Sequence, residues 1–178
     1  MKVRGYLVEG FVLVVDLDSS VKLYSSAFFG TPLGVEKPKG GERVPLRLSL
    51  PEALYLAERG ELEVLDEKGE EVSLERLREL VNSTRRGAAV YAVYKDLRSS
   101  GLVVRSGLKF GADFIVYRLG PGLEHAPYIV HVSEEGERVD PADIVRASRV
   151  GHSVRKSFVM AFPRRGRTEY LVLKWVRL

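Results

Sequence analysis

The order of helical and strand-like segments in residues 84–178 restricts the fold more than any other feature of the sequence. An amphipathic stretch that ends at Gly101 predicts a helix, because glycine is a favoured residue just past a helix end. Three short apolar segments follow it and predict strands. Asp140 and the proline after it begin a second helix, and two more apolar segments joined by PRRGRT predict a β-hairpin. This order indicates a mixed α/β (α+β) fold in which a sheet is flanked by helices.

Residues 1–83 predict a smaller α/β domain. Two strand-like segments flank Gly10, and Ser49 and Glu52 have the spacing of a capping box at the start of a helix. Ser73 caps a second amphipathic helix that ends near the domain boundary. We place that boundary between 82 and 87, which gives an N-terminal domain of residues 1–83 and a C-terminal domain of residues 84–178.

The two predicted domains differ in charge. Residues 1–83 hold 11 Lys and Arg against 15 Asp and Glu, and residues 84–178 hold 17 against 9, so their net charges are −4 and +8. A basic domain beside an acidic one indicates a polyanion-binding surface on the C-terminal half. The alternative is an arginine-rich surface of a thermophilic protein, which the absence of glutamine and the single asparagine, Asn82, also favour.

Composition excludes several other classes of protein. The chain has no cysteine, so disulfides and thiolate metal sites are unavailable. No apolar run is long enough to span a membrane, and charges interrupt the N-terminal segment early, at Glu9 and Asp16. We therefore expect a cytoplasmic protein without a membrane contact.

Three residues of the C-terminal half have side chains suited to cleaving RNA without a metal. Tyr117 lies in GADFIVY, His125 in EHAPYIVH and Lys156 in HSVRKSF. Such cleavage needs a base for the 2′-hydroxyl, an acid for the 5′-oxygen and a cation beside the phosphorane. A phenol, an imidazole and an ammonium group supply these functions.

Each of the three residues also has a structural interpretation. A tyrosine at the end of a strand is usually a packing residue, and a phenol needs nearby cations, such as Arg118 or Lys156, to act as a base at neutral pH. A loop histidine is often only exposed. His131 and His152 are more simply interpreted as structural, although His152 lies four residues before Lys156. Arg149, Ser153 and Lys156 have spacings of four and three, so they share one face if the helix continues.

The segments around these residues, together with SLPEALYLAERG at 49–60, resemble the archaeal tRNA-splicing endonuclease family. The resemblance covers most of the chain and implies a restriction-endonuclease-like catalytic domain without a cofactor. Metal-dependent nucleases of that fold hold Mg²⁺ with clustered acidic residues and a lysine, and residues 84–178 have no acidic-x-Lys motif beside a second carboxylate, so a metal mechanism is disfavoured. The resemblance implies that Tyr117 is the general base, His125 the general acid and Lys156 the stabiliser of the transition state. The substrate would be precursor tRNA with a bulge–helix–bulge, cut to a 2′,3′-cyclic phosphate and a 5′-hydroxyl.

The resemblance also implies contacts beyond the reacting groups. Arg149 and Arg177 match two arginines that clamp a flipped-out base of the bulge, by stacking that tolerates any sequence. Lys37 and Lys39 lie in a long Gly- and Pro-rich loop that matches a substrate-contacting insertion of the crenarchaeal branch. Family members assemble as dimers of dimers, and here residues 169–176 would form the strand that pairs two copies.

The last hairpin departs from the family pattern. Family members carry an acidic loop there, which fills a basic pocket on a neighbouring subunit, whereas this chain has Arg164, Arg165 and Arg167 against only Glu169. We therefore expect a heterotetramer in which a second, non-catalytic structural subunit supplies the acidic loop. Two alternatives remain: the chain is itself a structural subunit of that complex, or it is a basic RNA-binding module without catalysis.

Overall fold

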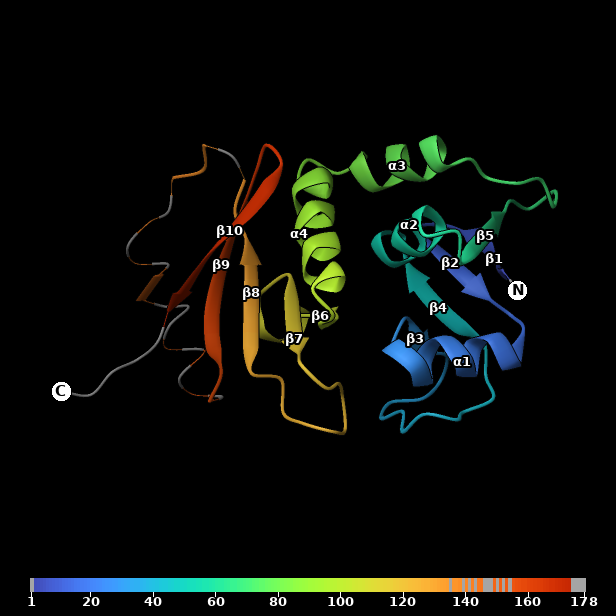
Figure 1. The fold of residues 1–178 in the computed structure, drawn as a ribbon, viewed down its shortest axis with the longest axis horizontal. Coiled ribbons are helices and arrows are strands. Elements are labelled where there is room, and N and C mark those ends of the chain that lie inside the picture. Colours follow the sequence, from blue (N-terminus) through green and yellow to red (C-terminus); the bar gives the residue numbers. More distant parts are fainter. Residues whose placement is uncertain are drawn as a thin grey trace. The chain divides into compact units, whose positions relative to one another are not determined.

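The computed structural model describes residues 2–134, 136–138, 140, 142, 144–145, 149, 151, 153 and 155–173. The chain divides into two compact units, Met1–Gly87 and Ala88–Leu178, and each has its own sheet (Figure 1). Helices and two mixed sheets confirm the predicted α/β (α+β) class. Within the described part of the chain, no helix is both long and apolar enough to cross a membrane.

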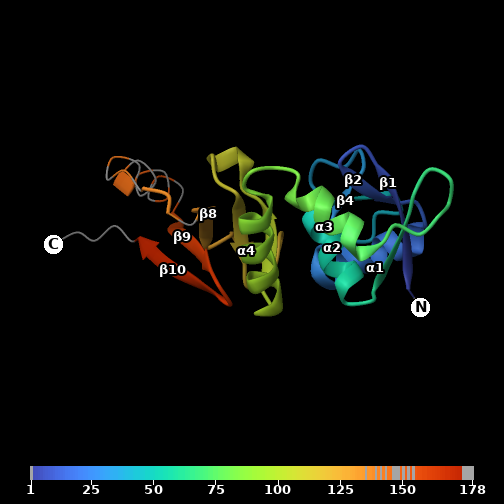
Figure 2. The same cartoon turned by 90° about the horizontal axis from the view of Figure 1, so that it is seen from above.

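The N-terminal unit is a five-stranded sheet with helices against one face (Figure 2). Its strand order is β3-β4-β2-β1-β5, in which only the β1–β5 pair is parallel. The strands are β1 (Val3–Val8), β2 (Phe11–Val14), β3 (Thr31–Pro32), β4 (Leu46–Ser49) and β5 (Leu62–Leu65). The helices are α1 (Leu17–Ala27), α2 (Leu50–Glu58) and α3 (Leu74–Asn82).

Local capping signals set the helix starts of this unit. Ser49 and Glu52 form the predicted capping box, and Ser73 accepts the Arg76 N–H at the start of α3. Glu52 is also buried and accepts the Gly30 N–H at 2.8 Å, so one carboxylate joins α2 to the segment before β3. The sheet is therefore fixed to its helices by polar contacts as well as by its aliphatic core.

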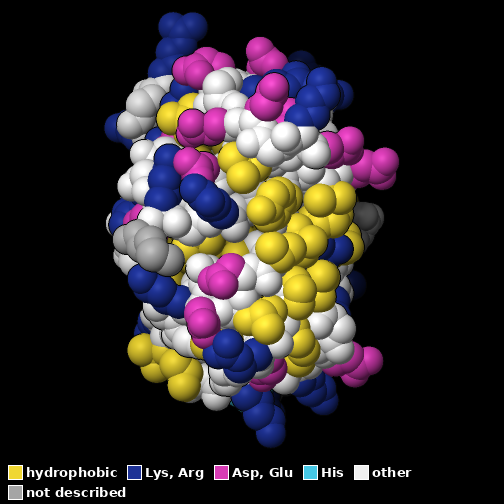
Figure 3. Space-filling model, turned by 90° about the vertical axis from the view of Figure 1, so that its right-hand side faces the viewer, with side chains coloured by type: hydrophobic (Ala, Val, Ile, Leu, Met, Phe, Trp, Pro, Cys, Tyr) yellow, Lys and Arg dark blue, Asp and Glu magenta, His cyan; other side chains and the backbone are white. Residues whose placement is uncertain are grey.

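The other face of the N-terminal sheet exposes apolar side chains beside charged ones, among them the ion pair of Arg4 with Glu63. Along β1 the side chains alternate, so that Val3 is buried whereas Tyr6 and Val8 are exposed. Phe11 lies opposite Val8 in the antiparallel pair, and the Arg47 guanidinium lies 5.8 Å from the centre of its ring. Figure 3 shows hydrophobic side chains gathered in a band on this side of the unit, with charged side chains around them.

The C-terminal unit is a second five-stranded sheet with the order β10-β9-β8-β7-β6. β8 and β9 run parallel, and the other neighbouring pairs are antiparallel. Its elements are α4 (Gly87–Ser99), β6 (Val103–Ser106), the 3-10 turn η1 (Leu108–Phe110), β7 (Phe114–Tyr117), β8 (Tyr128–Val132), β9 (Ser157–Arg164) and β10 (Arg167–Leu173). The predicted last hairpin is confirmed, and residues 174–176 of its expected second strand lie outside the described residues.

Side chains pack against both faces of this sheet at its central strands, β7, β8 and β9. On one face, Tyr94 of α4 packs against Phe114, with ring centroids 5.9 Å apart. On the other, Ile129 and Phe158 form a buried cluster with Ile144 packed against it. The described residues between 142 and 153 are helical, as predicted, and lie on the opposite side of the sheet from α4 (Figures 1 and 2). This packing on both faces holds the strands whose ends carry the predicted site.

Candidate functional site

Strand register brings the three predicted catalytic residues to one end of the C-terminal sheet. The last pair between β7 and β8 joins Val116 to Tyr128, and the first pair between β8 and β9 joins Tyr128 to Ser157. Tyr117 therefore comes directly after Val116, and Lys156 comes directly before Ser157, so both lie one residue beyond the pairs with Tyr128 at this end of the sheet. The chain at 125–127 enters β8 at the same end, where the Pro127 oxygen accepts the Ser157 N–H at 2.9 Å. Segments far apart in sequence thus meet because β8 and β9 are parallel.

Lys156 is held in place by its own ammonium group. Its Nζ donates to the Ala126 oxygen at 2.7 Å, in the segment directly after His125, and lies 5.9 Å from the centre of the Phe110 ring. The Lys156 N–H donates to the Gly151 oxygen at 2.8 Å. A partly buried ammonium fixed beside the His125 segment is suited to facing a phosphate.

Gly151 was not singled out from the sequence, yet the turn into Lys156 requires it. A Cβ atom at this position would lie 2.8 Å from the Lys156 oxygen. Arg155, one residue before Lys156, has a φ of 55°, so the chain reverses tightly here. A glycine inside an otherwise helical segment was the signal available, because such a glycine usually has a packing reason.

Tyr117 is half-buried at the end of β7, on the same side of the strand as Ile115. Burial raises the pKa of the Tyr117 phenol, the nearby Arg105 cation lowers it, and the Glu124 carboxylate raises it further. From the sequence, Arg118, Lys156 and the arginines of the following helix were the expected cations. Instead the Arg118 guanidinium donates to the Tyr128 hydroxyl at 2.9 Å, and Arg105 was missed because only the β6–β7 pairing brings it near.

His125 is exposed in the segment between the β7–β8 loop and β8. The other described histidine, His131, lies further along β8, where its Nδ1 is 3.4 Å from Asp113 Oδ2. Asp113 also accepts the Val132 N–H at 2.7 Å, so it joins the histidine to the β8 backbone. These contacts support the structural interpretation of His131, whereas His152 lies outside the described residues.

The predicted RNA-binding residues are placed in part. Arg149 and Ser153 are exposed and helical, with the spacing of one face, while Arg177 lies outside the described residues. Lys37 and Lys39 are exposed in the N-terminal unit. Glu42 shapes their loop, since its carboxylate accepts the Gly40 N–H at 2.9 Å as well as the Lys39 N–H.

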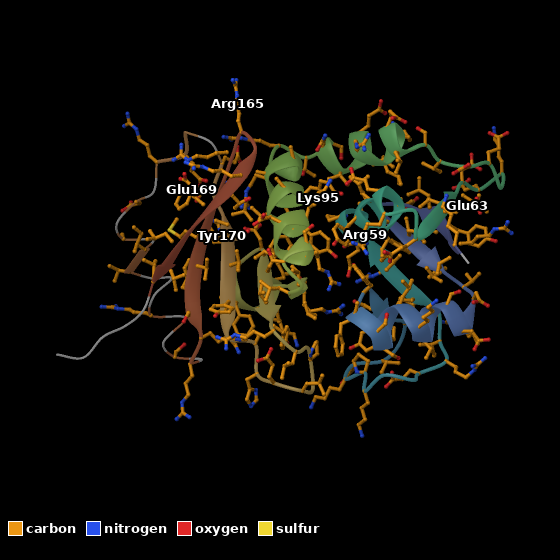
Figure 4. The ribbon with its side chains drawn as sticks, viewed as in Figure 1. Arg59, Glu63, Lys95, Arg165, Glu169 and Tyr170 are labelled. Carbon is orange, nitrogen blue, oxygen red and sulfur yellow. The ribbon has the colours of Figure 1, made fainter. Side chains whose placement is uncertain are left out.

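The basic hairpin is partly neutralised by its own acidic residue. Glu169 accepts from Arg164 Nε at 3.0 Å and from Arg167 at 2.7 Å. Arg165 lies at the turn between β9 and β10, where its side chain points away from the sheet (Figure 4). Next to Glu169, Tyr170 donates to Asp96 of α4, so the middle of β10 is joined to that helix.

No group of three or more His, Asp or Glu side chains is arranged to hold a metal ion among the described residues. At this end of the sheet the chain carries a phenol at Tyr117, an imidazole at His125 and an ammonium group at Lys156. Those groups move protons and offset negative charge on phosphate.

Family models match both units of the chain. The model of the tRNA intron endonuclease catalytic C-terminal domain matches residues 88–170, and that of the tRNA intron endonuclease N-terminal domain matches residues 3–78. The chain thus belongs to the tRNA intron endonuclease family, as its sequence predicted, and it is an endonuclease.

The relatives match along their whole length. A tRNA-splicing endonuclease of Hyperthermus butylicus is 49% identical over 177 residues, which cover 97% of this chain and 98% of the relative. Proteins of the same name from Saccharolobus islandicus and Saccharolobus solfataricus are each 42% identical, over 99% of this chain and 100% of the relative.

Proposed function

We propose that this chain is the catalytic subunit of a tRNA-splicing endonuclease that cleaves precursor tRNA at bulge–helix–bulge splice sites. The observation that carries the proposal is the strand register, which gathers Tyr117, His125 and Lys156 at one end of one sheet. Membership of the family and the names of its relatives supply the substrate class. We also expect the protein to work in the cytoplasm.

In the proposed reaction, Tyr117 takes the proton from the ribose 2′-hydroxyl. The 2′-oxygen attacks the adjacent phosphorus, the bond from phosphorus to the 5′-oxygen breaks, and His125 gives a proton to that leaving oxygen. Lys156 offsets the charge of the phosphorane. The products are a 2′,3′-cyclic phosphate and a 5′-hydroxyl, and the reaction consumes no metal and no cofactor.

The environment of Tyr117 fits a strong base that is seldom ionised. Burial raises the pKa of its phenol above the ordinary value, and Arg105 is the cation that opposes this effect. Replacing Tyr117 by a fluorinated tyrosine lowers the pKa of the phenol and enlarges the ionised fraction. If Tyr117 is the base, the pH at which cleavage responds to that ionisation moves down with the phenol pKa, and an unmoved profile would argue against this role.

Recognition of the bulge is proposed to use groups outside the reacting centre. The exposed helical face with Arg149 and Ser153 would bind the RNA, and Arg149 and Arg177 would stack on an unpaired base. Lys37 and Lys39 would add phosphate contacts that broaden the range of accepted bulges. These contacts read the shape of the RNA rather than its sequence.

We propose that the active assembly contains a second, non-catalytic subunit that provides an acidic hairpin loop. Glu169 neutralises part of the charge of Arg164 and Arg167, but the turn of the β9–β10 hairpin stays basic at Arg165. A basic turn would bind an acidic surface of a partner and would be repelled by a basic pocket. β10 lies at the edge of its sheet with Leu171 and Val172 exposed. Pairing of two copies through residues 169–176 would cover that edge.

The decisive experiment incubates a bulge–helix–bulge RNA with this chain, with and without its candidate partner subunit, in EDTA. We expect cleavage that persists in EDTA and leaves a 2′,3′-cyclic phosphate. Loss of cleavage in EDTA, with protein and RNA still folded, would contradict the metal-independent reaction. RNA binding without any cleavage by the complete assembly would instead identify the chain as a non-catalytic RNA-binding or structural subunit.

A further inference from the structure

The loop between Tyr117 and His125 is closed by a single carboxylate. Glu124 Oε1 accepts the N–H groups of Arg118 and Leu119, the latter at 2.7 Å. The backbone of Glu124 returns the contact, since its N–H donates to the Gly120 oxygen at 3.2 Å. The start and the end of the loop are therefore tied together by one side chain.

We infer that Glu124 is a positioning residue that fixes Tyr117 relative to His125, an inference that rests on the proposed roles of those two residues. The first tied N–H belongs to the residue after Tyr117, and the carboxylate belongs to the residue before His125. Each proposed catalytic residue is thus one peptide unit away from the same contact. Misplacing reacting groups by about 1 Å can cost roughly 100-fold in rate.

The rest of the loop makes this tie necessary. The loop carries two glycines with positive φ, Gly120 at 131° and Gly122 at 83°, and exposes the side chains of Leu119 and Leu123. Flexible backbone and exposed apolar side chains provide little packing to fix its ends. Beyond the loop, the bond from Lys156 to the Ala126 oxygen holds the other side of His125.

The hydrogen bonds of Glu124 and its negative charge would affect catalysis in different ways. The Leu119 N–H, with help from the Arg118 N–H and guanidinium, lowers the pKa of Glu124, so it is ionised at neutral pH. Its negative charge raises the pKa of Tyr117 and does not assist that residue as a base. Both N–H groups bind the same oxygen, so a glutamine, which keeps one carbonyl oxygen and loses the charge, can preserve the tie.

The test compares Glu124→Gln with Glu124→Ala in the complete endonuclease assembly, on a bulge–helix–bulge RNA under single-turnover conditions. We expect Glu124→Gln to cleave within a few-fold of the wild type and Glu124→Ala to cleave roughly 10- to 100-fold more slowly, with unchanged RNA affinity. Hydrogen exchange at the Arg118 and Leu119 amides should accelerate in Glu124→Ala only. Glu137→Ala is the matched control, because Glu137 accepts the Glu134 N–H at 2.8 Å in a loop at the other end of β8.

The parallel variants Tyr117→Phe and His125→Ala separate the possible failures. If both are inactive while Glu124→Ala cleaves at the wild-type rate, the positioning role is wrong and the proposed catalytic roles stand. If Glu124→Gln is as slow as Glu124→Ala with normal amide exchange, charge and not placement matters, and the inference again fails. If Tyr117→Phe and His125→Ala both cleave normally, the catalytic roles fail, and a positioning role in cleavage fails with them.

Discussion

Replacing Lys156 by methionine should destabilise the C-terminal unit as well as slow the reaction. The change keeps an unbranched side chain but removes the ammonium that bonds the Ala126 oxygen at 2.7 Å and lies 5.9 Å from the Phe110 ring centre. A hydrogen bond to a charged group contributes about 1.5–3 kcal/mol and an exposed cation–π contact about 0.5–1 kcal/mol. Water can reach the freed carbonyl in part, so we expect a net loss of about 2 kcal/mol.

For a unit of this size, each kcal/mol shifts the melting temperature by roughly 4–8 °C, so the expected decrease is about 8–16 °C. Calorimetry of the variant and the wild type measures it. Lys109→Met is the control, because Lys109 is exposed in η1 beside the same Phe110, and surface substitutions usually change stability by less than about 0.5 kcal/mol. A melting temperature for Lys156→Met equal to that of Lys109→Met would refute the tethering role.

Cleavage by Lys156→Met, measured where the variant is fully folded, tests the second role of the ammonium. Removing one group that stabilises a developing charge typically costs about 10²–10³-fold in rate. We expect a decrease of that size in single-turnover cleavage. A decrease that only follows the folded fraction of the variant would show that Lys156 shapes the site without acting on the phosphorane.

Three further predictions concern separate parts of the chain. His125→Ala should lose roughly 10²–10⁴-fold in cleavage with RNA binding retained, whereas His131→Ala should lower stability only; the reverse order would refute the assignment of the acid. Alanine at both Lys37 and Lys39 should reduce the slope of log affinity against log salt by about 1–2, and an unchanged slope would indicate an ordinary surface loop. Burial first, and then Asp96, raises the pKa of the Tyr170 phenol in the folded protein. The stability that this phenol contributes is therefore fully present below pH ~10 and is lost as the pH rises further. The melting temperature of Tyr170→Phe should fall less at alkaline pH than that of the wild type, and an equal fall would contradict this.

Local signals in the sequence were enough to predict most of the elements. The capping box at Ser49 and the cap at Ser73 satisfy free N–H groups within four residues, so each start can be recognised without knowing the fold. Gly101, just past α4, has a φ of 81°, as its role at a helix end requires. At the start of α1, the Asp16 carboxylate accepts the Ser19 N–H, which is again a local cap.

The contacts of the site could be predicted only in part. The residue types at Tyr117, His125 and Lys156 indicated chemistry, but their arrangement depends on the register of β7, β8 and β9, which no local pattern determines. The bond from Lys156 to Ala126 spans thirty positions of sequence, and Arg105 approaches Tyr117 only across a strand pair. Glu124 lies beside His125 in the sequence, but no local pattern predicts that its carboxylate accepts the Arg118 and Leu119 N–H groups at the start of the loop.

The parallel pairing of β8 with β9 also has a consequence for folding. Parallel neighbours cannot be joined by a tight turn, so the chain must complete residues 133–156 before the two strands can meet. Contacts between such distant segments form slowly, because the entropy of closing the intervening chain is lost before the contact is gained. The β9–β10 hairpin can form early, but Lys156 reaches Ala126 only after the crossover closes. A newly synthesised or partly unfolded chain in which this crossover is still open should therefore lack the contact that places Lys156 beside the His125 segment.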